Sequence, residues 1–274
     1  MTPKENMFHK SWFDFLEEIE SAKRILEFKR NEEIFFRGHT QGRYRLLPGI
    51  FRNLEKGISK KQIWDNESDM FYEFRARAKE VHNGNLTDWD VLFYMQHHGV
   101  NTRLLDWSES FGVALYFAML NYEKGKSKPC IWILNPYKLN ETYHGSRDMY
   151  APENLDITDK STREVSSYSD YLLYGRADDM IWWKQPLAIY PIRRVDRLTT
   201  QGGYFTIHGT DVRPIEEIIA PSKRIWRKIE LPDEAAESAL LFLDQAGINH
   251  YTMFPDLDGL SNYLNKKYFD QKIV

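Results

Sequence analysis

Short apolar runs of strand length constrain the fold of this chain more than any other feature of its sequence. Each run ends at a glycine, a proline or charged residues, which is typical of buried β-strands. The predicted strands are residues 33–38, 130–134, 187–190, 203–208 and 225–231. The most economical arrangement of these strands is one small sheet, mixed or antiparallel.

Segments with helical periodicity surround the strands. The predicted helices begin at residues 11, 63, 87, 109, 232 and 256. The first runs to Lys29 with Ser11 as its N-cap, and Asp106 or Ser108 is expected to cap the one that begins at Glu109. Residues 138–184 are polar, rich in tyrosine and irregular, which indicates an inserted loop region with short helices. We therefore expect a single α+β domain over residues 11–270, its sheet packed with N- and C-terminal helices.

Composition limits the classes of function. The 274 residues carry a net charge of −3, so a basic field over the whole surface, as in many nucleic-acid binders, is absent. Aromatic residues make up 15% of the chain, enough for a core and a pocket lined with rings. The only cysteine, Cys130, opens an apolar run and is expected to be buried. No leader-like segment or membrane-spanning run is evident, so we expect a cytoplasmic protein without membrane contact.

Arg37 is the clearest candidate for chemistry, because it directly follows Phe36 at the end of a strand that should be buried. A buried charge is costly unless it is paired or used. Its guanidinium could hold a phosphate or carboxylate through two hydrogen bonds, and Gly38 lets a ligand or another backbone come close. The alternative is a buried ion pair, with Asp106 as the obvious partner. The two interpretations are compatible.

Two further clusters of polar residues lie within apolar surroundings. The first contains Gln96, His97, His98, Thr102, Arg103, Asp106, Trp107 and Ser108. The second contains Arg197, Gln201 and Phe205, with His208 on the same predicted strand. The adjacent histidines lack an evident third ligand, so no metal site is predicted. Phosphate-loop, dinucleotide-binding, zinc-protease and nucleophile-elbow motifs are missing from the sequence.

At these clusters the chain resembles the FRG-domain family, which is named for the run found here as Phe36-Arg37-Gly38. The resemblance extends from about Ser11 to Tyr268. Its other motifs are the segment from Gln96 to Trp107, the run Ala114 to Ala118, the spaced Gln201, Gly203 and Phe205, and the run Phe254 to Leu260.

The order of elements more weakly resembles an ADP-ribosyltransferase core, which implies NAD as substrate. Residues implied in NAD binding are Arg37, Gly38, His97, Thr102, Arg103, Trp107 and Phe205, and those implied in catalysis are Asp106, Ser108 and Gln201. Gln201 stands where those enzymes carry a glutamate. A neutral amide stabilises the developing positive charge on the ribose less well than a carboxylate does. Asp106, Asp196 or Glu216 could supply the carboxylate instead.

Three functional hypotheses follow. The resemblance implies an NAD-dependent ADP-ribosyltransferase-like effector or toxin in bacterial defence or a toxin–antitoxin system. Such an enzyme would act on a protein or nucleic acid and have an antitoxin or regulatory partner. The second hypothesis is a non-catalytic ligand- or partner-binding module with a buried network of Arg37, Asp106 and Gln201. The third, a nucleic-acid enzyme or binder that uses His97, His98 and local clusters of basic residues, is opposed by the net negative charge.

Overall fold

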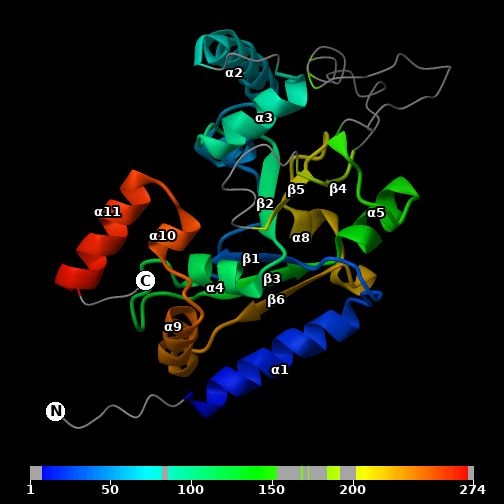
Figure 1. Ribbon diagram of the computed structural model, residues 1–274. Helices are drawn as coiled ribbons and strands as arrows, with labels where there is room; N and C mark the ends of the chain where they lie inside the picture. The colour runs from blue at the N-terminus through cyan, green and yellow to red at the C-terminus, as the bar shows by residue number, and fades with distance from the viewer. Residues whose placement is uncertain are drawn as a thin grey trace.

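Six antiparallel strands form one sheet in the order β4-β5-β2-β1-β3-β6 (Figure 1). The computed structural model describes residues 8–81, 86–152, 184–191 and 202–270, with Tyr168 and Leu172. The strands are β1 (Phe35–His39), β2 (Leu104–Ser108), β3 (Cys130–Leu134), β4 (Leu187–Ile189), β5 (Gly203–Ile207) and β6 (Trp226–Glu230). The predicted α+β class is confirmed, and the sheet is antiparallel rather than mixed.

The sheet is nearly divided between β1 and β2. These two strands pair through one registered couple, Phe36 with Ser108, whereas β1 pairs with β3 through five. Beyond this couple the strands diverge: β2, β5 and β4 run up the view, and β1, β3 and β6 run across it (Figure 1). We call this junction the β1–β2 seam. It separates a β1 half (β1, β3 and β6) from a β2 half (β2, β4 and β5).

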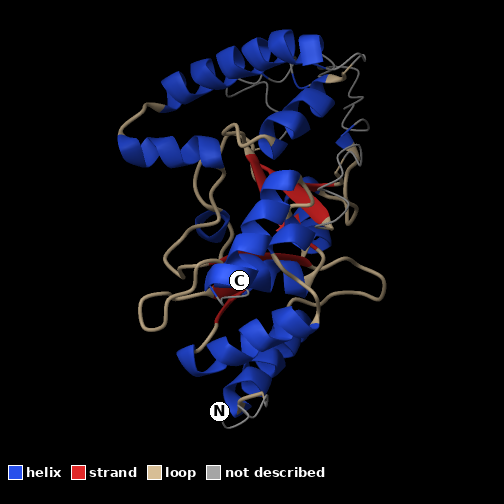
Figure 2. Ribbon diagram, turned by 60° about the vertical axis from the view of Figure 1, so that its left-hand side comes forward, coloured by secondary structure: helices blue, strands red, loops and turns tan. Residues whose placement is uncertain are grey.

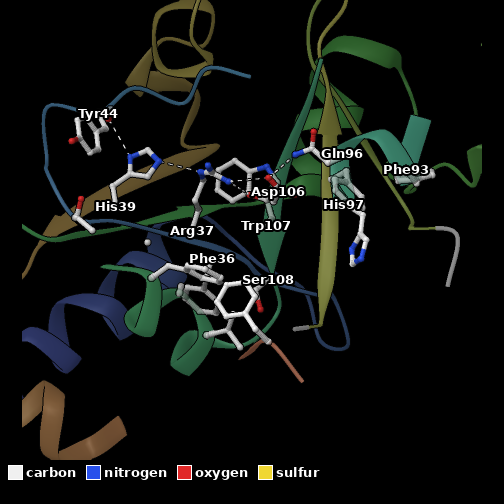
Figure 3. A pocket seen from close by; sticks show the side chains of 17 residues that line it. Phe36, Arg37, His39, Tyr44, Phe93, Gln96, His97, Asp106, Trp107 and Ser108 are labelled. Atoms are coloured by element: carbon white, nitrogen blue, oxygen red, sulfur yellow. Dashed lines mark hydrogen bonds and ion pairs between the residues drawn. The ribbon is translucent and has the colours of Figure 1, made fainter. Parts of the chain in front are cut away.

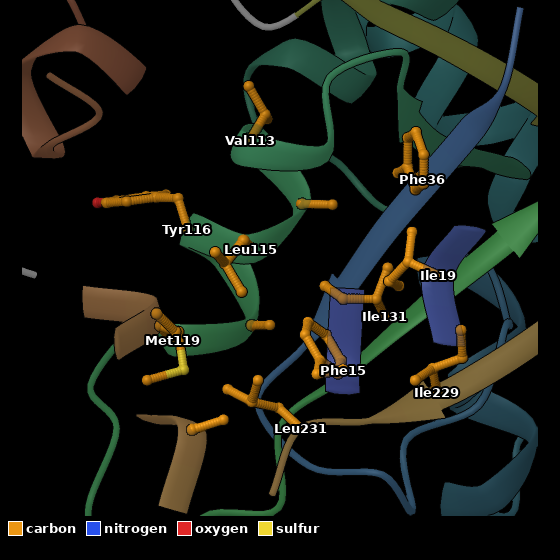
Figure 4. Close-up of a cluster of buried hydrophobic side chains, with 14 of the residues drawn as sticks. Phe15, Ile19, Phe36, Val113, Leu115, Tyr116, Met119, Ile131, Ile229 and Leu231 are labelled. Carbon is orange, nitrogen blue, oxygen red and sulfur yellow. The ribbon is translucent and has the colours of Figure 1, made fainter. Parts of the chain in front are cut away.

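One face of the β1 half is covered by three helices, α1 (Lys10–Ile25), α4 (Phe111–Met119) and α9 (Ala236–Gln245). Their apolar side chains meet those of the strands in one buried cluster (Figure 4). Helix α4 lies directly on β1, because Gly38 has no side chain. A β-carbon there would stand 1.8 Å from the carbonyl oxygen of Ala114.

The β2 half is covered by different helices, α2 (Lys60–Val81) and α3 (Asp88–His97). Phe93 of α3 packs on Phe205 of β5, with ring centroids 4.9 Å apart. A third cluster on the opposite face of the sheet joins both halves through the contact of Phe35 with Trp107. Helices thus surround the strands (Figure 2).

The remaining helical segments are short or lie toward the C-terminus. They are α5 (Pro136–His144), α8 (Ile215–Ile218), α10 (His250–Met253), α11 (Leu257–Asn265), the 3₁₀ turns η1 (Gly49–Lys56), η3 (Pro221–Lys223) and η4 (Asp233–Ala235), and the π-helical turn η5 (Lys266–Asp270). Helix α5 occupies the start of the predicted insertion, and residues 153–183 of that segment, apart from Tyr168 and Leu172, lie outside the described residues. Within the described residues, the helices are all too short or too polar to cross a membrane.

Two predicted helix starts were wrong. His9, rather than Ser11, caps α1, since its ring accepts a hydrogen bond from the amide of Ser11. Ser110 caps α4 through the amide of Val113, whereas Asp106 and Ser108 belong to strand β2. Helix α1 also ends before Lys29, because Glu27 adopts a left-handed backbone conformation with φ of 59°.

Candidate functional site

A cleft of about 410 Å³ opens at the β1–β2 seam, between helices α3 and α4 (Figure 3). Divergence of the two strands removes backbone pairing there, and side chains from both halves of the sheet turn into the gap. The lining residues are Phe36, Arg37, Gly38, His39, Thr40, Tyr44, Phe93, Gln96, His97, Asp106, Trp107, Ser108, Val113, Ala114, Phe117, Phe205 and Phe254.

A chain of polar contacts crosses the seam (Figure 3). Arg37 donates from Nε to Nε2 of His39 over 3.0 Å and from Nη1 to the carbonyl oxygen of Asp106 over 2.6 Å. The Asp106 carboxylate accepts from Nε2 of Gln96 over 2.8 Å, and Gln96 in turn accepts from the hydroxyl of Thr102. The Arg37 side chain thus replaces backbone hydrogen bonds where β1 and β2 separate.

The positive charge of Arg37 is only partly compensated. The nearest carboxylate oxygen, Oδ2 of Asp106, lies 3.7 Å from Nη1, and the side chain of Arg37 is 19% exposed. Burial lowers the pKa of Arg37, Asp106 opposes that fall, and the nearby cation of Arg52 adds to it. An arginine remains protonated in such surroundings. The cleft therefore contains a largely buried cation held mostly by neutral acceptors.

Arg103 shows the opposite arrangement. Its guanidinium donates to both carboxylate oxygens of Glu67, and the distance from Nε to Oε1 is 2.7 Å. Its Nη1 donates to the carbonyl oxygens of His208 and Gly209. Arg103 is 1% exposed, and the hydroxyl of Tyr168 also donates to Glu67. The charge of Arg103 is thus neutralised inside the protein, and its side chain does not line the cleft.

Aromatic rings form the walls of the cleft. Phe93 and Phe205 of the β2 half are almost fully buried, and so is Trp107, whose indole donates to the hydroxyl of Thr206 over 3.0 Å. Phe117 and Phe254 stand on the side of α4, in contact with each other, and are partly exposed. Flat apolar walls beside a cation suit a ligand that combines rings with an anionic group.

Most of the residues predicted for the site do converge. Seven of them line the cleft: Arg37, Gly38, His97, Asp106, Trp107, Ser108 and Phe205. Thr102 lies behind the lining and orients Gln96, and Arg103 is engaged elsewhere. Gln201 lies outside the described residues. Arg37 and Asp106 do pair, across 3.7 Å, but the predicted burial of the pair is wrong, because the side chain of Asp106 is 55% exposed.

The proposed carboxylates differ in their positions. Asp106 lies in the cleft, whereas Glu216 accepts a hydrogen bond from the amide of Leu46 over 3.1 Å and lies 3.8 Å from Arg45. Burial raises the pKa of Glu216. Asp196 lies outside the described residues. Among the residues that are described, no three histidine, cysteine, aspartate or glutamate side chains gather as a metal site would require.

Several lining residues were not predicted for the site, of which His39, Tyr44 and Phe254 are the most important. His39 had a usable signal, because alternate residues of a strand face the same side and His39 is two residues after Arg37. Phe254 begins the motif run Phe254 to Leu260, but nothing in that run indicated that it reaches the cleft, which it does through the packing of the C-terminal helices.

Comparisons with known proteins bear on the family alone. Searches of curated proteins and of solved structures each found no significant match. The resemblance to an ADP-ribosyltransferase core therefore stays a prediction. The FRG domain model matches residues 32–127, which include both Phe36-Arg37-Gly38 and the segment from Gln96 to Trp107. These residues supply β1, β2 and most of the cleft, so this part of the chain, about a third of its length, matches the FRG domain.

Proposed function

We propose that the cleft binds a phosphate-bearing nucleotide, with NAD as the ligand, and that the protein is an ADP-ribosyltransferase-like enzyme. The observation that carries the proposal is the partly compensated cation of Arg37 in a cleft with aromatic walls. Arg103 is the internal comparison, because a purely structural arginine in this fold holds a carboxylate through two hydrogen bonds. A phosphate would give Arg37 the anion that the protein supplies only at a distance.

A hydrogen-bond acceptor stands beside this donor. Gln96 donates a hydrogen bond to Oδ2 of Asp106. Because the side chain of Asp106 is 55% exposed, its Oδ1 can accept a hydrogen bond from a ligand hydroxyl. Phosphate and ribose hydroxyls occur together in nucleotides, and rings of the ligand would lie against Phe117 and Phe254, which are partly exposed in the cleft. The cleft volume of about 410 Å³ is within the range of small-molecule sites.

In the proposed reaction, an oxygen or nitrogen of the acceptor bonds to C1′ of the nicotinamide ribose. The bond from C1′ to nicotinamide breaks, nicotinamide leaves with the electron pair, and the acceptor loses a proton. Asp106 is the cleft carboxylate that can face the positive charge developing on the ribose. We extend the proposal to an effector or toxin role in bacterial defence, with a macromolecular acceptor and a regulatory partner.

Calorimetric titration with NAD, ADP-ribose and adenosine tests the binding. Arg37→Gln should weaken binding of NAD and ADP-ribose about tenfold or more, because one charge-assisted contact is lost. Adenosine, which has no phosphate, should bind both proteins equally. The control is Arg224→Gln, which removes a surface arginine whose side chain is 59% exposed. Equal NAD affinity in the wild type and Arg37→Gln, or no binding to the folded wild type, would falsify the binding proposal.

Nicotinamide release tests the chemistry separately. Asp106→Asn retains an oxygen that can accept from Gln96, but it removes the negative charge. We expect this variant to bind NAD and to release nicotinamide at least tenfold more slowly. Unchanged release by Asp106→Asn would exclude its proposed role.

A non-catalytic binding module is the second candidate. The polar chain from His39 through Arg37, Asp106 and Gln96 to Thr102 supports it, because this chain joins the two halves of the sheet without any reaction. NAD binding without nicotinamide release, in the presence of cell lysate as a source of acceptors, would favour this function.

A further inference from the structure

We propose that His39 is a positioning residue that holds the Arg37 guanidinium with its Nη2 nitrogen toward the ligand phosphate. This inference rests on the proposed function, since it concerns how the same site presents its cation. His39 and Arg37 lie on the same face of β1, and both line the cleft (Figure 3).

The contacts of His39 determine which ring nitrogen carries the proton. Nε2 lies 3.0 Å from the Nε–H of Arg37, a group that can only donate, so this hydrogen bond requires an unprotonated Nε2. Nδ1 lies 3.2 Å from the carbonyl oxygen of Tyr44 and also 3.2 Å from the indole Nε1 of Trp132, which can only donate. A proton on Nδ1 satisfies Arg37 and Tyr44 and gives up only the Trp132 contact, whereas a proton on Nε2 would satisfy Trp132 alone. We therefore assign the proton of the neutral ring to Nδ1, which donates to Tyr44. The imidazole is thus held between Tyr44 and Arg37.

This bonding settles which nitrogens of Arg37 remain for a ligand. Nε donates to His39 and Nη1 donates to the carbonyl oxygen of Asp106. Nη2 makes no hydrogen bond to the residues that the structure describes. A phosphate cannot take Nε and Nη2 together, as it does in a side-on contact, because Nε is already engaged.

The surroundings of His39 keep its ring neutral. Arg37 of β1, Arg52 of η1 and Lys228 of β6 are the charged groups that act on the ring, and all three are cations. With burial, they lower the pKa of His39 to about 3. Cys130 of β3 also lies nearby, and burial raises its thiol pKa to about 12, so it adds no charge. An imidazolium would direct an N–H at the N–H of Arg37, and this environment excludes it at neutral pH.

Fixing Arg37 before the ligand arrives has a consequence for affinity. An arginine side chain loses considerable conformational entropy when it binds an anion. His39 and Asp106 together already restrict Arg37 in the unliganded protein. We therefore expect His39 to affect ligands that carry phosphate and to have no effect on those that lack it.

Two variants of His39 test the inference. His39→Leu removes the acceptor at similar volume, and His39→Gln retains an oxygen that can accept from Arg37. For NAD and ADP-ribose, we expect affinity about tenfold lower in His39→Leu and within about threefold of wild type in His39→Gln. Adenosine should bind all three proteins alike. Thermal melts identify any variant that has not folded.

A measurement on the unliganded protein keeps the inference separate from the proposed function. Nitrogen-15 NMR should show a His39 ring protonated on Nδ1, and an Arg37 Nε–H signal that exchanges faster in His39→Leu than in wild type or His39→Gln. An Nε2-protonated ring, or equal NAD affinity in wild type and His39→Leu, overturns the role of His39 alone. If the wild type binds none of the three ligands, the proposed function fails and the role of His39 fails with it.

Discussion

Gly38 of β1 and Ala114 of α4 meet backbone to backbone: a β-carbon at Gly38 would lie 1.8 Å from the carbonyl oxygen of Ala114 and 2.7 Å from the amide nitrogen of Ala118. Both atoms belong to the backbone of helix α4, so they can move away only if the whole helix moves. The glycine of the family motif thus sets the distance between a strand and a helix that both line the cleft.

Gly38→Ala should therefore destabilise the protein by about 3 kcal/mol or more, because the added methyl group would meet backbone atoms and no flexible side chain could move out of its way. Urea unfolding measures the change. Gly42→Ala is the matched control, because a β-carbon there would meet only the flexible ends of Glu230 and Lys228. Equal unfolding midpoints for the two variants would show that α4 can shift at little cost.

Glu67→Gln should be among the most damaging single substitutions. It leaves the buried guanidinium of Arg103 without its carboxylate, and loss of one partner of a buried pair costs about 3–5 kcal/mol. Arg37→Gln should cost clearly less in the same unfolding assay, since its carboxylate partner stands 3.7 Å away and is 55% exposed. The opposite order would contradict the division between a structural and a ligand-binding arginine.

Stability should fall as the pH drops below about 6.5. The pKa values of His39 and His208 are both lowered to about 3, chiefly by burial, from an ordinary value of 6.5. Between these values the unfolded chain binds protons that the folded protein does not, so the free energy of unfolding declines toward acid, by up to about 1.4 kcal/mol per pH unit for each histidine.

Urea titrations between pH 7 and pH 5 measure this decline in a range where ordinary carboxylates stay ionised. His39→Gln should give a shallower dependence on pH than the wild type, because one of the two contributing rings is gone. Parallel profiles for the two proteins would refute the prediction for His39.

Cys130 should be unreactive in the folded protein. The side chain is fully buried, and burial raises its thiol pKa to about 12, which suppresses the nucleophilic thiolate. A thiol-specific reagent should label it only at the rate at which the protein opens, and at once in denaturant. Rapid labelling under native conditions would show that the edge between β3 and β6 opens locally.

Much of the sheet could be predicted from the sequence, because local signals and tertiary structure agree there. Residues 130–134 form β3 as predicted, since an uninterrupted apolar run bounded by prolines leaves few alternatives. Strand β2 carried a weaker signal: exposed Asp106 interrupts its apolar residues, and Asp106 and Ser108 are both of the kinds that cap helices. The predicted cap position was therefore wrong although the helix itself was found.

The site was predictable to the extent that it lies within one motif. Arg37 and Asp106 were expected to pair, and their roles depend on residues near them in the family motifs. The role of Arg103 was not predictable, because Glu67 meets it only in the folded protein. Arg37 follows the apolar run Ile34 to Phe36 and Arg103 follows the polar pair Asn101-Thr102, but neither context shows which arginine is neutralised by a carboxylate inside the protein.

The division of the sheet at one residue pair also bears on how the molecule unfolds. Each half has its own helices and its own buried cluster on one face. The halves meet at Phe36, Ser108 and the Arg37 side chain, and on the opposite face they share the apolar cluster that contains Phe35 and Trp107. We expect the seam to open more readily on the side of the cleft than on the side of the shared cluster. An anion bound by Arg37 in the cleft would contact both halves of the sheet. Ligand binding would therefore couple the unfolding of the two halves and make unfolding of the chain more cooperative.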